Sequence, residues 1–152
     1  MNLRNLALLA WLLTPACGSA PDGGSGGTPP IAYAQMNREQ RTAFMSAVVL
    51  PQMKQVFTEF DAKYQNLSCA TCHGSGVADG SFAMPSPQVP ALPASEEAFA
   101  EYIKDPEHAR WSQFMIDKVW PKMADLLQVD KFEPKAHPDG FSCHNCHTLL
   151  GP

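Results

Sequence analysis

The sequence has no cluster or stripe of lysine and arginine, and the formal net charge of its 152 residues is −4. Because proteins that bind nucleic acid usually carry a basic surface, we exclude that class of partner. Charged residues make up only 17% of the chain, whereas it contains 14 prolines and 10 glycines. Since these two residues interrupt helices and strands, long stretches cannot be regular. The length fits one domain, in which side chains alone have limited means to build a core.

Long apolar runs are also missing, apart from a short one at the amino terminus. Residues 6–13 form that run, and Arg4 precedes it with a positive charge. The run is too short to cross a bilayer but is typical of an export signal. We therefore expect residues 1–16 to be a signal peptide and the protein to be exported.

A cysteine stands where this signal ends. Cys17 follows alanine and precedes a segment rich in glycine, serine and proline. The arrangement resembles a lipoprotein-type signal, although Thr14 stands where such signals favour leucine. We expect a lipid on Cys17, a flexible tether over residues 17–36, and attachment to the inner or outer membrane of a bacterium, facing the periplasm. The alternative is an ordinary signal peptide cut near Ala16 or Ala20.

The most specific feature is a C-x-x-C-H motif that occurs twice. The two copies are Cys69-Ala70-Thr71-Cys72-His73 and Cys143-His144-Asn145-Cys146-His147. This motif is the attachment signature of c-type haem. Two thiols three positions apart lie on one side of a helical turn, where they can form thioethers with the two vinyl groups of a porphyrin, and the histidine binds the iron. The sequence therefore predicts two covalently bound haem c groups and a diheme domain over residues 37–152.

Cysteine pairs of this kind have three other common uses. A four-thiolate zinc site usually has its two C-x-x-C pairs about 15–20 residues apart, whereas these repeat at an interval of 74. Two disulfides would not require a histidine after each pair. A redox-active C-x-x-C normally belongs to a βαβ pattern, and none is visible. Haem attachment explains the spacing and the histidines together.

The second iron ligand of each haem is predicted from an internal repeat. Only five residues follow His147, none of them a good ligand for haem iron, so that ligand has to lie upstream. The segment 44–53, Phe-Met-x-x-x-Val-Leu-Pro-x-Met, matches segment 114–123, Phe-Met-x-x-x-Val-Trp-Pro-x-Met, at an offset of 70. We expect Met53 to pair with His73 on the first iron, and Met123 with His147 on the second.

Other side chains stay open as iron ligands. Met45 and Met115 share the repeat but lie farther from the haem motifs. Met84, in a Phe-Ala-Met-Pro context, could serve the first haem, and His108 or His137 could serve the second. The proline-rich segment 86–93 reads as extended chain, which we expect to wrap the first haem.

Capping residues and prolines predict where the helices begin and bend. Asn37, Ser95 and Asp105 each precede a segment of helical pattern and can accept backbone hydrogen bonds at its start. Pro51 and Pro121 fall inside the two repeated helices, where each removes a hydrogen bond and bends the helix. The predicted fold class is all-α with long irregular loops, in which two helix–loop–C-x-x-C-H repeats pack around two covalent haems.

The order of a Met-bearing helix, a loop and C-x-x-C-H resembles the haem-binding segments of the cytochrome subunit of photosynthetic reaction centres. The resemblance covers residues 37–149 and rests on the two motifs together with Met53 and Met123. It implies a mostly helical chain, a distal methionine on the helix before each motif, lipid anchoring and electron transfer. The chain has two such segments instead of four, so no photosynthetic partner is implied.

The expected function is therefore that of a one-electron carrier and not of an enzyme. Ligation of iron by histidine and methionine fills both axial positions, and the negative net charge steers such a carrier toward redox partners with basic patches. The alternatives are a small diheme peroxidase-like enzyme, which would need an open iron site, and a haem-based sensor, although no signalling domain is attached.

Overall fold

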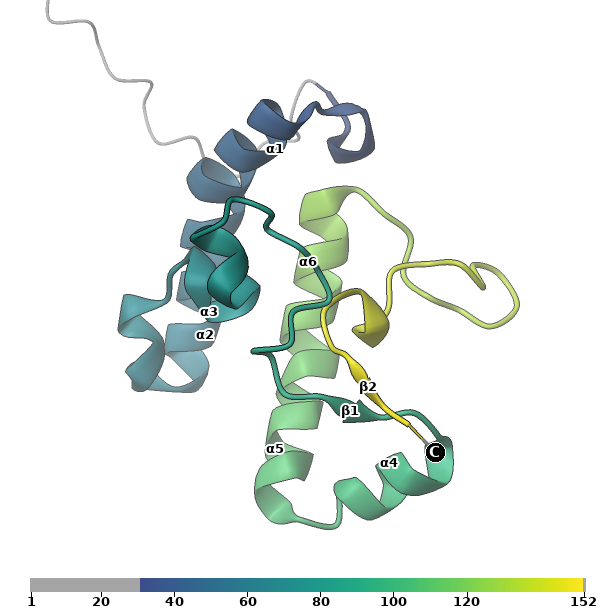
Figure 1. Ribbon diagram of the computed structural model, residues 1–152. Helices are drawn as coiled ribbons and strands as arrows, with labels where there is room; N and C mark the ends of the chain where they lie inside the picture. Colours follow the sequence, from purple (N-terminus) through teal and green to yellow (C-terminus); the bar gives the residue numbers. More distant parts are fainter. Residues whose placement is uncertain (1–30, 152) are drawn as a thin grey trace, which may run out of the picture.

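The fold comes from a computed structural model, which describes residues 31–151. The described chain is mostly helical, as predicted, with α1 (Arg38–Phe44), α2 (Leu50–Phe60), α3 (Cys69–His73), α4 (Glu96–Tyr102), α5 (Pro106–Phe114) and α6 (Trp120–Leu127) (Figure 1). Short 3-10 turns cover Tyr33–Gln35, Ala62–Asn66, Gly74–Val77 and Cys143–Asn145. The predicted signal peptide, Cys17 and most of the predicted tether lie outside the described residues. Within residues 31–151, no helix combines the length and apolar character that crossing a membrane requires.

The predicted helix starts are confirmed. The side chain of Asn37 accepts from the N–H of Gln40 at 2.9 Å, and Gln40 returns a hydrogen bond to the N–H of Asn37. The Ser95 hydroxyl caps α4 by accepting from the backbone of Ala98, and the Asp105 carboxylate caps α5. Each cap satisfies backbone N–H groups that have no partner inside the helix.

Two long helices contain the repeated segment, and each has one wide turn directly before its proline. A π-helical turn, Met45–Val49, joins α1 to α2, and a second, Met115–Val119, joins α5 to α6. Because proline lacks an N–H and its ring crowds the preceding turn, the helix widens there instead of ending. The sequence predicted a bend at each proline; the structure has a π-turn before it in both copies, a feature often found at functional sites.

The side-chain core lies mainly on the first long helix. Its buried members are Met36, Phe44, Val49, Met53, Phe57, Leu67 and Phe114, the last from α5. Phe114 stacks on Phe60 with ring centroids 3.9 Å apart and meets the edge of Phe57 at 5.2 Å. These aromatic contacts hold the two long helices together.

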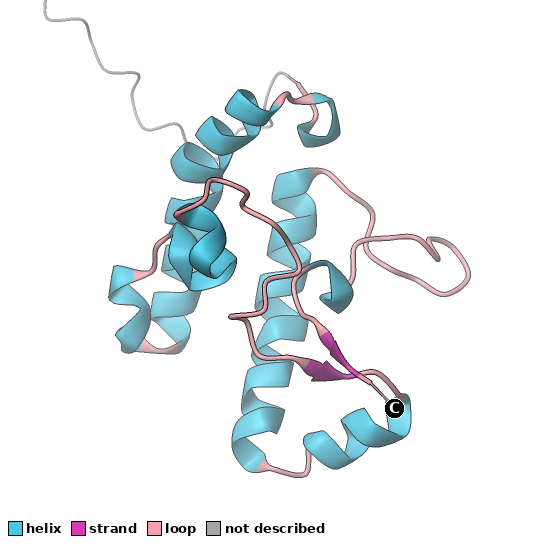
Figure 2. Cartoon of the chain, viewed as in Figure 1, coloured by secondary structure: helices cyan, strands magenta, loops and turns pink. Residues whose placement is uncertain are grey.

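Two irregular stretches and a short parallel strand pair complete the chain (Figure 2). Strand β1 (Leu92–Pro93) pairs with β2 (Leu149–Leu150), an element that the sequence did not predict. The loop before the second motif closes on itself, because Phe132 donates to Phe141 at 2.9 Å and Phe141 to Asp130 at 2.8 Å. A Cβ at Gly140 would lie 2.6 Å from the backbone of Lys131 in this closure, so the position requires glycine.

Candidate functional site

Each C-x-x-C-H motif opens with a turn that a serine and the third residue of the turn stabilise. The N–H of Ser68 donates to the hydroxyl of Thr71 at 3.1 Å, and the N–H of Ser142 donates to the amide oxygen of Asn145 at 2.7 Å. Thr71 and Asn145 are the second variable residues of the two motifs. They therefore help to place both cysteines of each pair on one helical turn.

The histidines of the two motifs have the same hydrogen bond to backbone. Nδ1 of His73 lies 3.1 Å from the carbonyl oxygen of Phe82, and Nδ1 of His147 lies 2.7 Å from that of Pro90. A carbonyl only accepts, so each Nδ1 carries a proton, and the neutral form of such a ring has its lone pair on Nε2. This second contact fixes tautomer and ring orientation, as it does for metal-bound histidines generally.

The cysteines of the motifs are free thiols. Burial raises the pKa of Cys72, and the charge on Cys69 raises it further; burial also raises the pKa of Cys143. The pKa of Cys146 rises to about 11, through burial first and then through the charges on Cys72 and Cys143. All four cysteines in residues 31–151 are unbridged in this structure.

The described part of the chain also lacks the geometry of the zinc alternative. No group of three or more histidine, cysteine, aspartate or glutamate side chains within it is arranged to hold a metal ion.

The two predicted methionine ligands lie at equivalent places on the long helices. Met53, on α2, has only 5% of its surface exposed. Met123, on α6, is partly buried and packs against the same core cluster. Each lies two residues beyond the proline that follows a π-turn.

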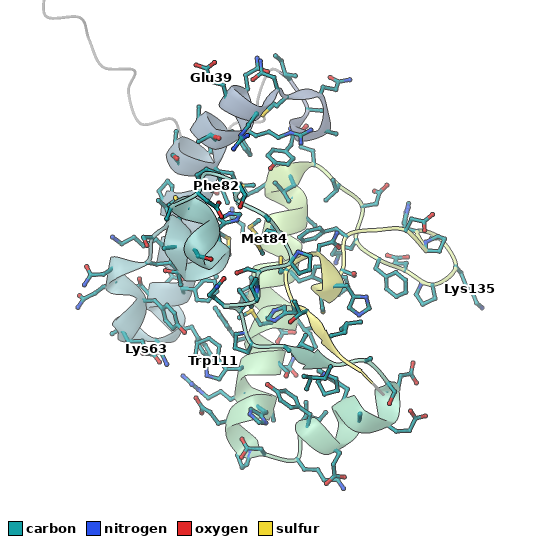
Figure 3. The ribbon with its side chains drawn as sticks, in the orientation of Figure 1. Glu39, Lys63, Phe82, Met84, Trp111 and Lys135 are labelled. Atoms are coloured by element: carbon teal, nitrogen blue, oxygen red, sulfur yellow. The ribbon has the colours of Figure 1, made fainter. Side chains whose placement is uncertain are left out.

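The alternative methionines are also partly covered. Met45 and Met115 are the first residues of the two π-turns and pack against the core cluster. Met84 lies in the loop after the first motif, near the centre of the view in Figure 3 and between α3 and α6 there. These residues therefore stay alternatives for the distal position.

The alternative histidines have other partners. His108 stacks on Tyr102 at 3.9 Å in the corner between α4 and α5, with its Nδ1 3.2 Å from the Tyr102 carbonyl. His137 lies in the exposed loop before the second motif, with its Nδ1 3.4 Å from the Asp130 carboxylate. Both rings are held near the surface, which favours Met123 over either histidine.

The proline-rich segment 86–93, which we predict to wrap the first haem, contacts both motifs. Its Gln88 donates to Ser75, just beyond the first motif, at 3.3 Å, and the segment also runs along the second motif. The N–H of Ser86 donates to the carbonyl of Cys146 at 3.4 Å, and that of Leu92 donates to Thr148 at 2.9 Å. The sequence predicted an extended chain, but the segment is not extended throughout, because the N–H of Val89 donates to the carbonyl of Ser86 at 3.1 Å and closes a turn. Beyond that turn the carbonyl of Pro90 accepts from His147.

The sequence also did not predict a hydrogen bond that joins α6 to the residue two positions before the second motif. The indole N–H of Trp120 donates to the carbonyl of Phe141 at 2.7 Å. Trp120 takes the place of Leu50 in the repeat, so only the second copy can make this bond. An indole at a repeat position otherwise filled by leucine was the available signal.

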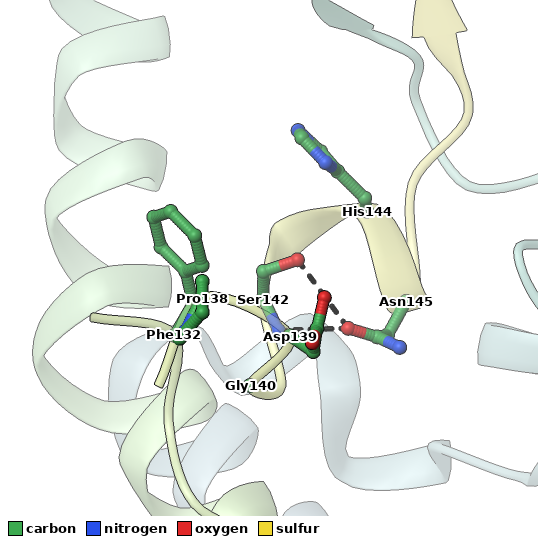
Figure 4. A pocket seen from close by; sticks show the side chains of 7 residues that line it. All are labelled: Phe132, Pro138, Asp139, Gly140, Ser142, His144 and Asn145. Atoms are coloured by element: carbon green, nitrogen blue, oxygen red, sulfur yellow. Dashed lines mark hydrogen bonds between the residues drawn. The ribbon is translucent and has the colours of Figure 1, made fainter. Parts of the chain in front are cut away.

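A cavity of about 340 Å³ opens beside the second motif (Figure 4). Its walls come from the closed loop and from the motif itself, with Phe132, Pro138, Asp139, Gly140, Ser142, His144 and Asn145 as lining residues. Figure 4 shows the ring of His144 directed away from Asp139 and Gly140. The second motif therefore faces open space on this side.

The residues present fit a covalently attached haem at each motif. Each motif supplies two free thiols on one turn and a histidine whose Nδ1 is hydrogen-bonded to a backbone carbonyl, and a helix with a covered methionine belongs to each copy. Comparisons with protein-family models, with curated proteins and with solved structures find no match to this chain.

Proposed function

We propose that this chain is an exported diheme c-type cytochrome that carries one electron at a time. The observation that supports it most is the matched environment of His73 and His147. Both rings donate from Nδ1 to a backbone carbonyl, directly after a pair of free thiols. A structural histidine has no need of this arrangement twice, whereas an iron ligand does.

In this proposal each haem has four protein attachments. Cys69 and Cys72 form the thioethers of the first haem, with His73 and Met53 as its axial ligands. Cys143 and Cys146 form those of the second, with His147 and Met123 as its axial ligands. When bound, each haem supplies an Fe(II)/Fe(III) couple.

The protein's part is to hold the axial ligands still. The Nδ1 hydrogen bonds fix the histidine rings. Packing against the core cluster fixes the side chains of Met53 and Met123, and with them the sulfur atoms proposed to bind iron. With both axial positions filled, no position stays open for a substrate, and methionine ligation raises the reduction potential. These features favour a carrier over a peroxidase-like enzyme.

The proposed partners are redox proteins with basic surfaces. Residues 95–151 hold ten acidic and six basic side chains, so the negative charge is concentrated in the part that contains the second motif. Such a field attracts a basic partner during encounter and is screened by salt. The second haem is therefore the better placed of the two for exchange with such a partner.

Haem content tests the proposal. The full chain is expressed in a bacterium that attaches haem c, and its denatured mass is measured. We expect the mass of the processed polypeptide plus two haems, no haem extracted by acidic acetone, and the weak near-infrared band of methionine-ligated ferric haem. A Cys69→Ser/Cys72→Ser variant should keep one haem. Bound zinc, or a single haem in the native protein, would overturn the proposal.

The lipid anchor on Cys17 is a separate proposal with its own test. A Cys17→Ser variant should be released into the soluble periplasmic fraction with both haems still attached. A variant that stays in the membrane fraction contradicts the lipid and leaves the haem assignment unaffected.

A further inference from the structure

A chain of hydrogen bonds links the two C-x-x-C-H motifs through the segment between them. Near the first motif, the side-chain amide of Gln88 donates to the hydroxyl of Ser75 at 3.3 Å. Gln88 also accepts from the hydroxyl of Ser86 at 3.0 Å. At the second motif, the N–H of Ser86 donates to the carbonyl of Cys146 at 3.4 Å. Three short links thus join the residue two beyond His73 to the residue before His147.

Ser86 is the most deeply buried side chain in residues 31–151, with 1% of its surface exposed. Burying a hydroxyl stabilises a protein only where its hydrogen bonds are made. The hydroxyl of Ser86 makes them to Gln88 alone, by donating to its side chain and accepting from its N–H at 3.3 Å. A buried serine with both bonds made to one neighbour is suited to fixing the local shape of the segment.

The first motif leaves room for this contact. Gly74 directly follows His73 and has φ +53°, and a Cβ there would collide with the side chain of Gln88. Glycine adopts this conformation without strain, so the glutamine can lie against the end of α3. The segment also holds the second motif at a further point, because Pro90 accepts from His147 at 2.7 Å.

We propose that Ser86 and Gln88 are positioning residues that fix the separation of the two haem-attachment motifs, so that an electron passes between two haems within one chain. The inference rests on the proposed function. With the distance between the two haems fixed, reduction of one haem would change the reduction potential of the other.

The test compares Ser86→Ala and Gln88→Ala with a matched control, Ser81→Ala. Ser81 belongs to the same loop, but its hydroxyl accepts only from Ala83 nearby, at 3.4 Å. Gln88 is exposed, so its replacement leaves folding intact even where loss of the buried Ser86 hydroxyl does not. Haem content, the EPR spectrum of the oxidised protein and a stepwise redox titration are measured for each variant.

The native protein and Ser81→Ala should show magnetic interaction between the two irons, and a shift in the potential of one haem when the other is reduced. Gln88→Ala and Ser86→Ala should keep both haems and lose most of that interaction and shift. Ser75→Ala should lose as much of the interaction and of the shift as Gln88→Ala does. The double variant Ser75→Ala/Gln88→Ala should lose no more than either single variant, because both changes remove the same hydrogen bond.

Two results separate this inference from the proposed function. If the native protein holds two haems but shows no interaction between them, or if Gln88→Ala keeps it in full, the positioning role is wrong and the cytochrome assignment stands. If the native protein holds no covalent haem, the assignment itself is wrong.

Discussion

The two long helices share a sequence pattern but differ in how their surroundings are packed. Around the first, residues 38–60, buried apolar side chains come from the helix and from both sides of it, Met36 and Leu67 included. Around the second, residues 106–127, only Phe114, Ala124 and Leu127 are buried. The buried core cluster takes Phe114 from the second helix and everything else from the first region. The same repeat therefore has two different cores.

The region of the second motif instead leaves apolar side chains uncovered. Every residue of 131–139 is exposed, and the large apolar side chains that are exposed there are Val129, Phe132, Leu149 and Leu150. Figure 1 shows the closed loop extending away from α6. A porphyrin bound at the second motif would offer these groups an apolar surface, so the second region should depend on its haem more than the first.

The largest effect is expected from removing haem attachment at one motif at a time. A Cys143→Ser/Cys146→Ser variant should lose most helical signal of residues 95–151 and become sensitive to protease within 128–142. Cys69→Ser/Cys72→Ser should keep more structure, because helix 38–60 has its own core. Apolar burial is worth ~25 cal/mol per Å² and a domain has only ~5–15 kcal/mol of stability, so the chain with all four changes should be largely unfolded.

Circular dichroism and mapping of protease cuts measure this difference. Haem content by mass confirms that each variant keeps its other haem. If Cys69→Ser/Cys72→Ser and Cys143→Ser/Cys146→Ser lose the same amount of structure, the two regions do not differ in their dependence on haem. A compact, protease-resistant chain without either haem would show that side chains alone build both regions.

The next effect separates ligation from packing at the methionines. Met53→Ala should cost about 2–5 kcal/mol of unfolding free energy, as removal of a buried methionine usually does. Met123→Ala should cost less, because Met123 is only partly buried. Each variant should remove the near-infrared methionine band of one haem and lower the potential of that haem alone, read by absorption during a redox titration.

Leucine supplies the matched control for this prediction. Met53→Leu keeps the volume and should cost less than about 1.5 kcal/mol, yet it removes the sulfur and should change the spectrum as fully as alanine does. If the leucine variants of Met53 and Met123 leave both spectra unchanged while Met84→Leu alters one, the distal assignment is wrong.

Local chemistry explains what the sequence could predict. The caps at Asn37, Ser95 and Asp105 depend on neighbours within one helical turn, and all three are found where expected. The wide turns before Pro51 and Pro121 are also local, although the sequence predicted a bend and not a π-turn. The mostly helical fold follows from these signals together. The C-x-x-C-H turns are likewise local.

Contacts between distant segments explain what could not be predicted. The proline-rich segment has no pattern that selects one motif over the other, and its place is decided by carbonyls that accept from His147 and by pairing of Leu92 with Leu149. The hydrogen bond from Trp120 to Phe141 joins residues 21 apart across an irregular loop. Neither contact has a period or a spacing to reveal it.

A smaller effect is expected at Trp120, which marks the second copy of the repeat. Trp120→Phe removes one of the two donors to the carbonyl of Phe141, which keeps the N–H of Phe132 at 2.9 Å. The change should cost at most ~1 kcal/mol, with a shift in the potential of the second haem only. Trp111→Phe is the control, because its indole donates to the exposed carboxylate of Glu107 at 2.8 Å. Redox titration and thermal unfolding measure both. A shift in the potential of the first haem instead would contradict the claim that the hydrogen bond from Trp120 to Phe141 supports the second haem.

The smallest effect compares the caps of the two long helices under acid. The Asp105 carboxylate accepts from the N–H groups of Glu107 at 2.9 Å and His108 at 3.0 Å, and these bonds, the one from His108 foremost, hold its pKa below the ordinary 3.8. A lowered folded pKa means that the stabilisation is present above 3.8 and is lost as the pH falls through the folded value. Asn37 does not titrate, so α5 should fray in acid while α1 stays capped.

Amide exchange in the reduced protein should show lost protection at Glu107 and His108 but not at Gln40. An Asp105→Asn variant keeps a cap oxygen and should remove the pH dependence; fraying of both helices alike, or fraying that persists in this variant, would place the acid sensitivity elsewhere in the chain.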